Sequence, residues 1–558
     1  MNRKIYSTLF IAVLSSLGYL NAQDLKKDVT VTKAYQPAIQ DANKISQMPT
    51  FNDTALVVPN FNYTISPVRL SSAFVPRPVS PAKMAAEPLK NLYGSYLKLG
   101  IGNPLSPLAE LNISNTRSKE NAYGLFLRHY SANGNIKLAN GLSVNAPFSD
   151  NEVSAYGKHI FKQSVISGDL GFTSNKVSFY GYDTNDTNLW KLPNVIKIFN
   201  NKPSTQNYIN NHINIALESL VTDSTHLYYK FDGSFNSLSD SYNTTENQFK
   251  LNGKVSKIVE KYYLGCEFNF NRYSYYGSKD TSTNSLFVLK PRIGKAKGEW
   301  RFEAGLDLAF GSTKQGAPFN AIPYATLDFA VVPSVIQAFV GIDGMVVQNS
   351  IASISKINPF IKPGNSFENT INNYRIFGGL KGNISQNIQF NTSVSFSSID
   401  NQIFFVNDTN SANHTQFKAV YDNIEEMRIN GEFDIKASDN LTFLAKGKYS
   451  SFSMTKQFKP WNMPNFEANI SARYNLQNKI LAKCDINYEG TRYAKQMNSE
   501  TPISLKSFID FNLGLEYRYT KILSVFLQIR NLTAAKYELW NQYPSYRFQI
   551  MAGFTYAL

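Results

Sequence analysis

Apolar and polar residues alternate one by one over long stretches of the chain beyond Gly94. Two examples are "EWRFEAGLDLAF" (299–310) and "FIDFNLGLEYRY" (508–519). In the first, one face would carry Trp300, Phe302, Ala304, Leu306, Leu308 and Phe310, and the other face Arg301, Glu303, Gly305 and Asp307. Successive side chains of a strand point to opposite faces, so this period of two predicts strands with one apolar and one polar face.

Two all-β architectures use such strands. A soluble sandwich or propeller buries the apolar face, whereas a transmembrane barrel turns that face to lipid and lines its lumen with the polar face. Many of the alternating runs are about 10–15 residues long, which suits a tilted strand that crosses a bilayer, whereas soluble strands average about five or six residues. The length of the runs therefore favours the barrel.

The alternating runs predict 22 strands, which begin near residues 94, 108, 121, 151, 163, 205, 225, 244, 261, 281, 299, 321, 335, 372, 387, 416, 440, 467, 479, 506, 521 and 547. One set of connections is short: 162–163, 222–225, 332–335, 385–387, 437–440, 476–479 and 519–521. The intervening set is longer: 136–150, 184–204, 352–371, 402–415, 455–466, 490–505 and 533–546. Short periplasmic turns and long extracellular loops are typical of outer-membrane barrels. We therefore predict an all-β fold, an antiparallel transmembrane β-barrel of about 22 strands with both termini in the periplasm.

The predicted lumen-lining residues are the polar members of two alternating strands. They are Arg301, Glu303 and Asp307 in the first strand, and Asp510, Asn512, Glu516 and Arg518 in the second. Charge pairs such as Arg301 with Glu303 are interpreted as ordinary lumen ion pairs that set the polarity of the lumen.

Residues 1–22 resemble a secretory signal, with a basic start (Arg3, Lys4), an apolar core (5–20) and a small-residue cleavage site. The next segment, 23–93, contains no glycine and carries eight prolines, Pro37, Pro49, Pro59, Pro67, Pro76, Pro78, Pro81 and Pro88. Proline at this density without glycine favours extended chain. We predict a mostly irregular periplasmic arm over 23–93 that either fills the lumen or binds a partner, followed by the barrel over 94–558.

Charge and composition change this picture little. The formal net charge is +15, which suits either nucleic acid or a surface that faces the phosphates of lipopolysaccharide. Because the chain is predicted to be an exported barrel, we attribute the positive charge to lipopolysaccharide phosphates and expect no nucleic-acid partner. Aromatic residues make up 14% of the chain, and those in "LYYK" (227–230), "KYYLG" (261–265), "SYYG" (274–277) and "YELW" (537–540) are predicted at the bilayer interfaces. Cys266 and Cys484 allow one disulfide at most.

The carboxy-terminal 38 residues resemble the end of TonB-dependent outer-membrane receptors. The matching elements are Asn531-Leu532, Lys536-Tyr537, Tyr543-Pro544 and a last alternating strand, 548–558. In that strand Phe554, Tyr556 and Leu558 would form the signal that the barrel-assembly machinery recognises, although the family usually ends on an aromatic residue. The resemblance implies a 22-stranded barrel in the outer membrane of a Gram-negative cell.

The resemblance departs from the family in one respect. TonB-dependent receptors carry a folded, glycine-containing plug domain before the barrel, and 23–93 is too short for it. An open lumen would then be filled by inward-folded loops, by the arm or by another protein. The position of a TonB box is held by Asp28, Val29, Thr30, Val31 and Thr32, which could add a strand to a partner sheet.

Motifs for catalysis are missing from the sequence. The histidines form no HExxH pattern, and there is no GxSxG elbow or phosphate-binding loop. His129 near Asp150, or His159, stays open as a rim site for acid–base or Ser–His chemistry. We predict no enzyme, no metal and no cofactor.

The sequence therefore predicts an integral outer-membrane barrel that either transports a solute or serves as the membrane subunit of a complex. The alternative is a non-transporting scaffold for surface lipoproteins or envelope assembly. Expected partners are outer-membrane lipids and lipopolysaccharide, the barrel-assembly machinery, and either TonB or lipoprotein subunits.

Overall fold

The computed structural model describes residues 93–115, 118–183, 204–220, 226–277, 281–313, 316–362, 367–411, 414–496 and 501–557. The predicted signal peptide and the predicted arm up to residue 92 lie outside these ranges.

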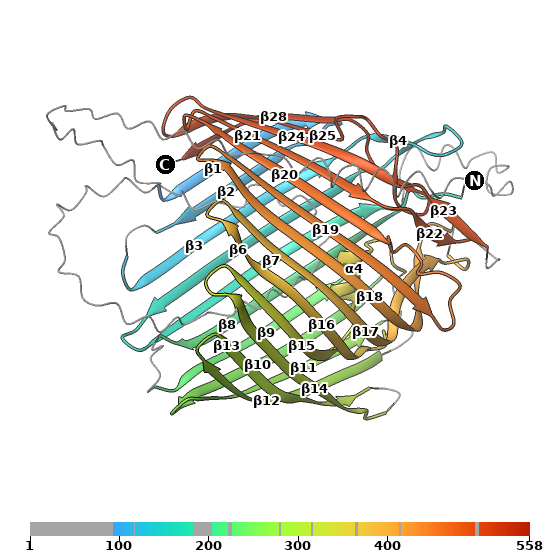
Figure 1. The fold of residues 1–558 in the computed structure, drawn as a ribbon. Helices are drawn as coiled ribbons and strands as arrows, with labels where there is room; N and C mark the ends of the chain where they lie inside the picture. The colour runs from blue at the N-terminus through green and yellow to red at the C-terminus, as the bar shows by residue number, and fades with distance from the viewer. Residues whose placement is uncertain are drawn as a thin grey trace, which may run out of the picture. The chain divides into compact units, whose positions relative to one another are not determined.

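Twenty-two strands form one antiparallel sheet whose first and last strands pair with each other, so the sheet closes into a barrel. In chain order these strands are β1 (Ser95–Asn103), β2 (Leu108–Ser114), β3 (Asn121–Ala132), β6 (Phe148–Ile160), β7 (Ser164–Ser178), β8 (Thr205–Ser219), β9 (Tyr228–Ser239), β10 (Thr245–Val259), β11 (Tyr262–Tyr276), β12 (Thr281–Lys297), β13 (Trp300–Ser312), β14 (Phe319–Val332), β15 (Ile336–Val347), β16 (Thr370–Ser385), β17 (Ile388–Asn407), β18 (Phe417–Ser438), β19 (Leu441–Met454), β20 (Phe466–Leu476), β21 (Ile480–Glu489), β24 (Phe508–Arg518), β25 (Leu523–Arg530) and β28 (Gln549–Ala557). Figure 1 shows them side by side with a common tilt. The predicted fold class and strand number are confirmed.

The connections differ between the two ends of the barrel. At the turn end, where β1 begins, many connections are short, such as 298–299 and 439–440. The other end, the loop end, carries the short hairpins β4 (Asn135–Lys137)–β5 (Ser143–Asn145), β22 (Arg492–Lys495)–β23 (Pro502–Leu505) and β26 (Glu538–Trp540)–β27 (Tyr543–Pro544), and also the helix α4 (Ile351–Ile357). Each barrel strand begins within three residues of its predicted start.

One predicted loop is wrong in extent. The connection expected over 402–415 is shorter, because β17 continues to Asn407. The residues Ile403, Phe404, Phe405 and Val406 are all buried, since the two faces of this strand end pack into two different clusters. A strand buried on both faces loses the alternating pattern that marks strands with one polar face.

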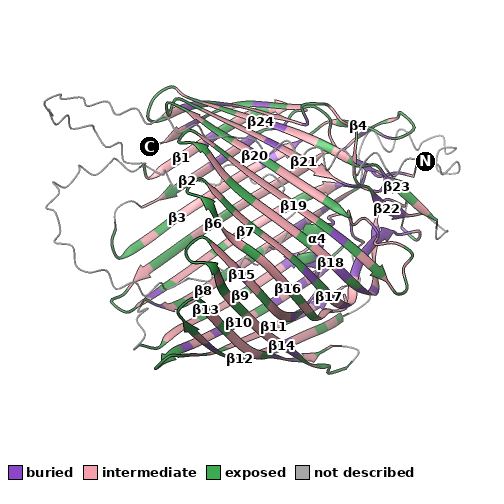
Figure 2. Cartoon of the chain, viewed as in Figure 1, coloured by how far each residue is buried: buried purple, intermediate pink, exposed green. Residues whose placement is uncertain are grey.

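The exposed apolar side chains lie on alternate strand positions, on the outer face of the barrel. Examples are Leu170, Ile213, Leu306, Val340 and Phe396. Figure 2 shows mostly exposed and intermediate residues along the strands, whereas buried residues gather near α4 and the loop ends of β17 and β18. In the described residues no helix has the length and apolar character needed to cross a membrane.

The seam between β1 and β28 closes the barrel. Gly100 pairs with Gly553 there, and Tyr96 pairs with Ala557. A Cβ on Gly553 would lie 2.0 Å from the carbonyl oxygen of Leu99. The two backbones therefore approach more closely than any side chain at this position would allow.

Candidate functional site

The polar face of β8 and β10 contacts a loop that is rooted on β15 and β16, five or more strands further around the barrel. The connection between β15 and β16 holds α4, and the Glu246 carboxylate of β10 accepts hydrogen bonds from the α4 backbone amides of Ile351 (2.8 Å) and Ala352 (3.1 Å). The Tyr208 hydroxyl of β8 donates to the carbonyl oxygen of Pro359 at 3.0 Å. A loop that reaches across a closed barrel to this face identifies it as the inner face.

Ion pairs follow the polar face around the barrel. They include Arg128–Glu110 (3.4 Å), Lys230–Glu218 (3.3 Å), Arg375–Asp343 (2.6 Å), Lys381–Asp328 (3.0 Å), Lys446–Glu432 (2.9 Å) and Lys448–Glu467 (2.6 Å). All but one join neighbouring strands, and the exception, Lys381–Asp328, links β16 to β14 past β15. The wall therefore supplies counter-charges to its own charged groups.

The lumen-lining residues predicted from sequence lie in two separate places. On β13, Arg301 is 3.6 Å from Glu303, and Asp307 forms ion pairs with Arg292 and with Lys290 (3.2 Å). They share the face opposite Phe302 and Leu306, which are exposed.

On β24, Asn512 donates to Asp510 at 2.7 Å, and Glu516 lies 3.9 Å from Arg518. The structure does not bring the β13 and β24 groups together. Phe554 and Tyr556 lie on β28 and pair with Leu99 and Leu97 of β1, whereas Asp28 to Thr32 and Leu558 lie outside the described residues.

Three aromatic rings from three loops meet at the loop end. Tyr543 of the β25–β28 loop stacks on Phe360 of the β15–β16 loop, with ring centroids 3.7 Å apart. Tyr180 of the β7–β8 loop contacts both rings edge-on, at 4.9 Å from Tyr543 and 6.1 Å from Phe360. Tyr543 has no exposed surface. We call these rings the aromatic triangle.

The roots of these loops show that the aromatic triangle lies over the lumen. Going around the barrel, eight strands separate the β7–β8 loop from the β15–β16 loop, eight more lead to the β25–β28 loop, and six complete the circle. The backbone walls of such a barrel are roughly 40 Å apart, given strands about 4.8 Å apart and tilted by about 40°. Loops rooted a third of the circumference apart can touch pairwise only over the middle of the mouth.

Further apolar residues extend the contact into a cap over the loop end. Buried members around the aromatic triangle are Phe179, Ile354, Ile361, Ile403, Phe405 and Phe417, with Trp540 packed against them. The prediction that Trp540 lies at the bilayer interface is therefore wrong, because this ring packs edge-on against Phe405 and Phe417.

The β25–β28 loop contacts more of the cap than the aromatic triangle alone. The Tyr543 hydroxyl donates to the carbonyl oxygen of Thr415 in the β17–β18 loop. Tyr546 donates to the carbonyl oxygens of Ala146 (2.5 Å) and Gly134 (3.2 Å) in the β3–β6 loop. Asn541 donates to Asn407 at the end of β17 at 2.8 Å. This loop is the hub of the cap.

Arg492 ties the β21–β24 loop to the hub. It is buried, and its guanidinium donates to the main-chain carbonyls of Leu539 (2.5 Å) and Glu538. Its Nε forms an ion pair with the Glu489 carboxylate at 2.6 Å. The planar guanidinium can donate to two neighbouring carbonyls in a fixed geometry, which a lysine ammonium cannot do as well.

Burial changes the acidity of groups in the cap. Burial raises the pKa of the Glu538 carboxyl. The hydrogen bond from the main-chain amide of Gln542 and the positive charges of Lys536 and Arg492 lower this pKa, but by less. Burial also raises the pKa of Tyr537 to about 12, and it raises the pKa values of Tyr180 and Tyr543. The tyrosine hydroxyls therefore remain protonated donors.

Aromatic runs in the long connections are the sequence signal for this cap. Aromatic residues occur in three long connections, in "SFYGYD" (178–183), "NPFIK" (358–362) and "YELWNQYPSY" (537–546). Connections that stay in solvent are polar, so aromatic runs in them indicate loops that pack on one another.

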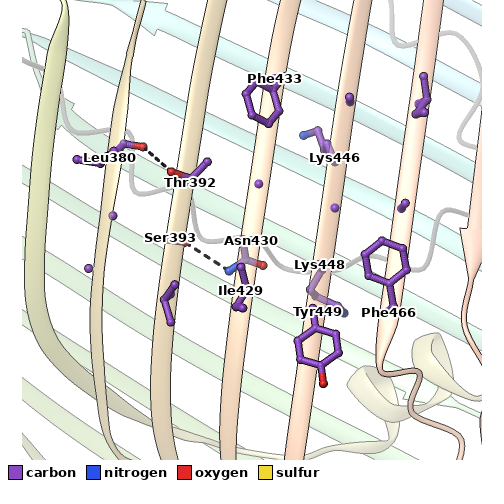
Figure 3. A pocket seen from close by; sticks show the side chains of 18 residues that line it. Leu380, Thr392, Ser393, Ile429, Asn430, Phe433, Lys446, Lys448, Tyr449 and Phe466 are labelled. Carbon is purple, nitrogen blue, oxygen red and sulfur yellow. Dashed lines mark hydrogen bonds between the residues drawn. The ribbon is translucent and has the colours of Figure 1, made fainter. Parts of the chain in front are cut away.

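A groove of about 530 Å³ lies on the wall over β16 to β20, and Figure 3 shows its lining. Its floor is a row of small residues paired across strands, Thr392, Gly431, Gly447 and Ala468. Exposed Leu380, Ile429 and Phe466 border it. These belong to the apolar outer face, so the groove opens toward lipid and not into the lumen.

A closed barrel with an apolar outer face and a polar inner face is the architecture of an integral outer-membrane protein, because all backbone groups that cross the bilayer are paired. Among the described residues no group of three or more His, Cys, Asp or Glu could hold a metal ion.

No protein-family model matches the sequence, and no curated protein matches it. The fold is similar to that of the iron transporter FrpB from Neisseria meningitidis, with 11% identity and a TM-score of 0.66 over 84% of this chain and 83% of that chain. The siderophore receptor PirA from Acinetobacter baumannii is similar at 10% identity and a TM-score of 0.63, over 85% and 81% of the two chains. The ferric-catecholate import receptor Fiu from E. coli has 9% identity and a TM-score of 0.60, over 84% and 82%. At these identities the likeness is one of fold, and the resemblance to this class of barrel extends beyond the carboxy-terminal segment. The predicted lack of a plug domain concerns residues outside the described ranges.

Proposed function

We propose that the protein transports a solute across the outer membrane through a lumen that the cap opens and closes. One observation carries the proposal: three loops meet over the middle of the loop end, whereas the wall is a closed sheet with a polar inner face whose backbone walls are roughly 40 Å apart. Loops can move aside, whereas a wall of paired strands cannot. The polar face that includes Arg301, Glu303, Asp307, Asp510, Asn512, Glu516 and Arg518 lines this path.

The class of solute follows from the barrels that are similar in fold. Their descriptions name an iron transporter and receptors for siderophores and ferric catecholates. Chelated iron is therefore the first solute to test. If TonB drives this transport, Asp28 to Thr32 bind it, and deletion of 24–36 stops uptake.

A reversible lock on the cap tests the proposal. Asn407→Cys and Asn541→Cys, in a background with Cys266→Ser and Cys484→Ser, join β17 to the hub loop through a short bifunctional thiosulfonate reagent. We expect uptake of chelated iron to fall to background when the lock is closed and to return after reduction. Either single cysteine variant, treated in the same way, is the control. Uptake that continues through the locked cap would rule out transport by this path.

A membrane scaffold is the second candidate. Two observations support it: the cap is buried like a protein core, and the charged groups of the wall pair with one another. Both suit a rigid barrel that does not open. A scaffold keeps its function when the cap is locked and co-purifies with lipoprotein subunits in mild detergent. Purification of the isolated chain alone under these conditions would argue against it.

A further inference from the structure

A serine, a histidine and an asparagine line up on the outer face near the loop end of β3 and β6. The Nε2 atom of His129 is 3.1 Å from the Ser131 hydroxyl oxygen, and its Nδ1 atom is 2.6 Å from Oδ1 of Asn151. All three side chains are partly exposed. Asp150, which is next to Asn151 in the sequence and was the expected neighbour of His129, instead accepts a hydrogen bond from Asn175 through its carboxylate.

The network around Asn151 fixes the tautomer of the histidine. The Asn151 amide nitrogen donates to the Ser149 hydroxyl at 3.2 Å and to the carbonyl oxygen of Ser174 at 3.4 Å. Its Oδ1 atom is thus left to accept, so Nδ1 of His129 carries the proton and Nε2 is the free base that faces Ser131. This is the order of contacts that a serine nucleophile, its general base and an orienting group require.

The register of the strands places this group at the edge of the apolar outer face. His129 pairs with Asn151, and Asn151 pairs with Ser174 of β7. Two residues further toward the turn end, on the same face, Leu127 pairs with Val153 and Val153 with Phe172. Val153 and Phe172 are exposed. The hydroxyl of Ser131 therefore lies where the hydrocarbon region of the bilayer meets the polar headgroups on the loop side.

We propose that Ser131, His129 and Asn151 form a hydrolytic site for acyl esters of outer-leaflet lipids. Ser131 Oγ attacks the ester carbonyl carbon while Nε2 of His129 takes its proton, and the tetrahedral intermediate expels the lipid alcohol, which receives that proton. Water then attacks the acyl-serine with His129 as the base, which releases a fatty acid and restores Ser131. Asn151 is a positioning residue that holds the imidazole in the required tautomer.

The first experiment uses the folded wild-type barrel in mixed micelles of detergent and phosphatidylethanolamine with a labelled acyl chain. Release of fatty acid and lysolipid is measured by mass spectrometry, and a fluorophosphonate probe marks the reactive serine. We expect one adduct on Ser131 and a loss of at least about 10³-fold in Ser131→Ala and His129→Ala. Asn151→Ala should lose activity as well, whereas Asn151→Asp keeps an acceptor and should recover most of it.

The same two strands offer a matched control. At the turn end, Nδ1 of His159 is 2.6 Å from Oδ1 of Asn121, and among the described residues no serine hydroxyl is hydrogen-bonded to the Nε2 atom of His159. His159→Ala should leave acyl release unchanged, and the mobility shift of the unheated barrel on SDS gels verifies folding of each variant. Equal release by wild type and Ser131→Ala, or no adduct on Ser131, would overturn the proposal. This outcome leaves the transport proposal untouched, since iron uptake does not depend on Ser131.

Discussion

At the scale of single residues, Tyr543 is the side chain on which most of the cap depends. Its ring contacts two other loops and its hydroxyl contacts a third. Gly181 reflects the same packing, because a Cβ there would lie 2.2 Å from the Tyr543 ring. In this chain, the tyrosine of the Tyr543-Pro544 pair, which resembles the end of TonB-dependent receptors, packs the loops of the cap together.

Truncation of Tyr543 should open the cap. Loss of a large buried aromatic side chain costs about 3–5 kcal/mol, so Tyr543→Ala should raise conductance in planar bilayers at least tenfold. Tyr543→Phe keeps the ring contacts and loses one hydrogen bond of about 1 kcal/mol, so its conductance should stay close to wild type. Tyr519, an exposed residue at the turn end, gives the control Tyr519→Ala. A closed pore in Tyr543→Ala would contradict the hub role.

The carboxyl of Glu538 should make the cap sensitive to pH. Burial raises its pKa in the folded cap, so the protonated form is the one that the cap favours. The stability that this gives is fully present below the ordinary pKa of glutamate, about 4.3, and is lost as the pH rises through the raised folded-state pKa.

Bilayer conductance should therefore increase from about pH 4 to about pH 8 in the wild type, and the increase should be smaller in Glu538→Gln. Glu260→Gln, in a turn at the far end of the barrel, controls for general charge effects. A pH profile that is the same in wild type and Glu538→Gln would exclude this role.

At the scale of elements, the β15–β16 loop is the part of the cap that is fixed to the wall. The Glu246 carboxylate accepts hydrogen bonds from two backbone amides at the start of α4, and Ser350 caps the same helix. In Glu246→Ala the two amides lose their acceptor, at a cost of about 1–3 kcal/mol.

We expect faster amide exchange of Ile351 and Ala352 in Glu246→Ala, measured by hydrogen–deuterium exchange mass spectrometry. Glu246→Gln keeps one acceptor oxygen and should give an intermediate rate. In the β19–β20 loop, the backbone amides of Lys456 and Gln457 donate hydrogen bonds to the Asp422 carboxylate of β18. They serve as an internal control. Unchanged exchange at α4 would show that the wall contact does not hold the loop.

The elements of the wall, and the Arg301–Glu303 pair within one strand, could be predicted from sequence, whereas contacts between different segments could not. Alternation in β13 and β24 depends on each strand alone, so it is visible in one sequence. The buried end of β17 carries no alternation, because Phe404 and Phe405 face two different clusters. The pairing of His129 with Asn151 depends on the register of β3 and β6, which the intervening loop sets. Contacts between distant segments, such as Tyr180 with Tyr543, have no local pattern at all.

At the scale of the whole molecule, the charge pairs of the wall and the apolar outer face predict a stable membrane barrel. The protein should remain in the membrane pellet after a carbonate wash and should migrate faster on SDS gels before heating than after it. Recovery in the soluble fraction would contradict the architecture. A chain without 24–92 should give the same two results, because the 22 paired strands begin at Ser95.

The seam between β1 and β28 also governs how the molecule is made. The strand that leaves the ribosome first among the 22 has to wait for the last one, and until then the sheet has two free edges that can pair with other chains. A chain cut short before Gly553 cannot become a smaller barrel. It remains an open ribbon, and such ribbons are a source of aggregates and a target for periplasmic proteases. Closure of the whole wall therefore depends on its final nine-residue strand, the last part of the sheet to be synthesised.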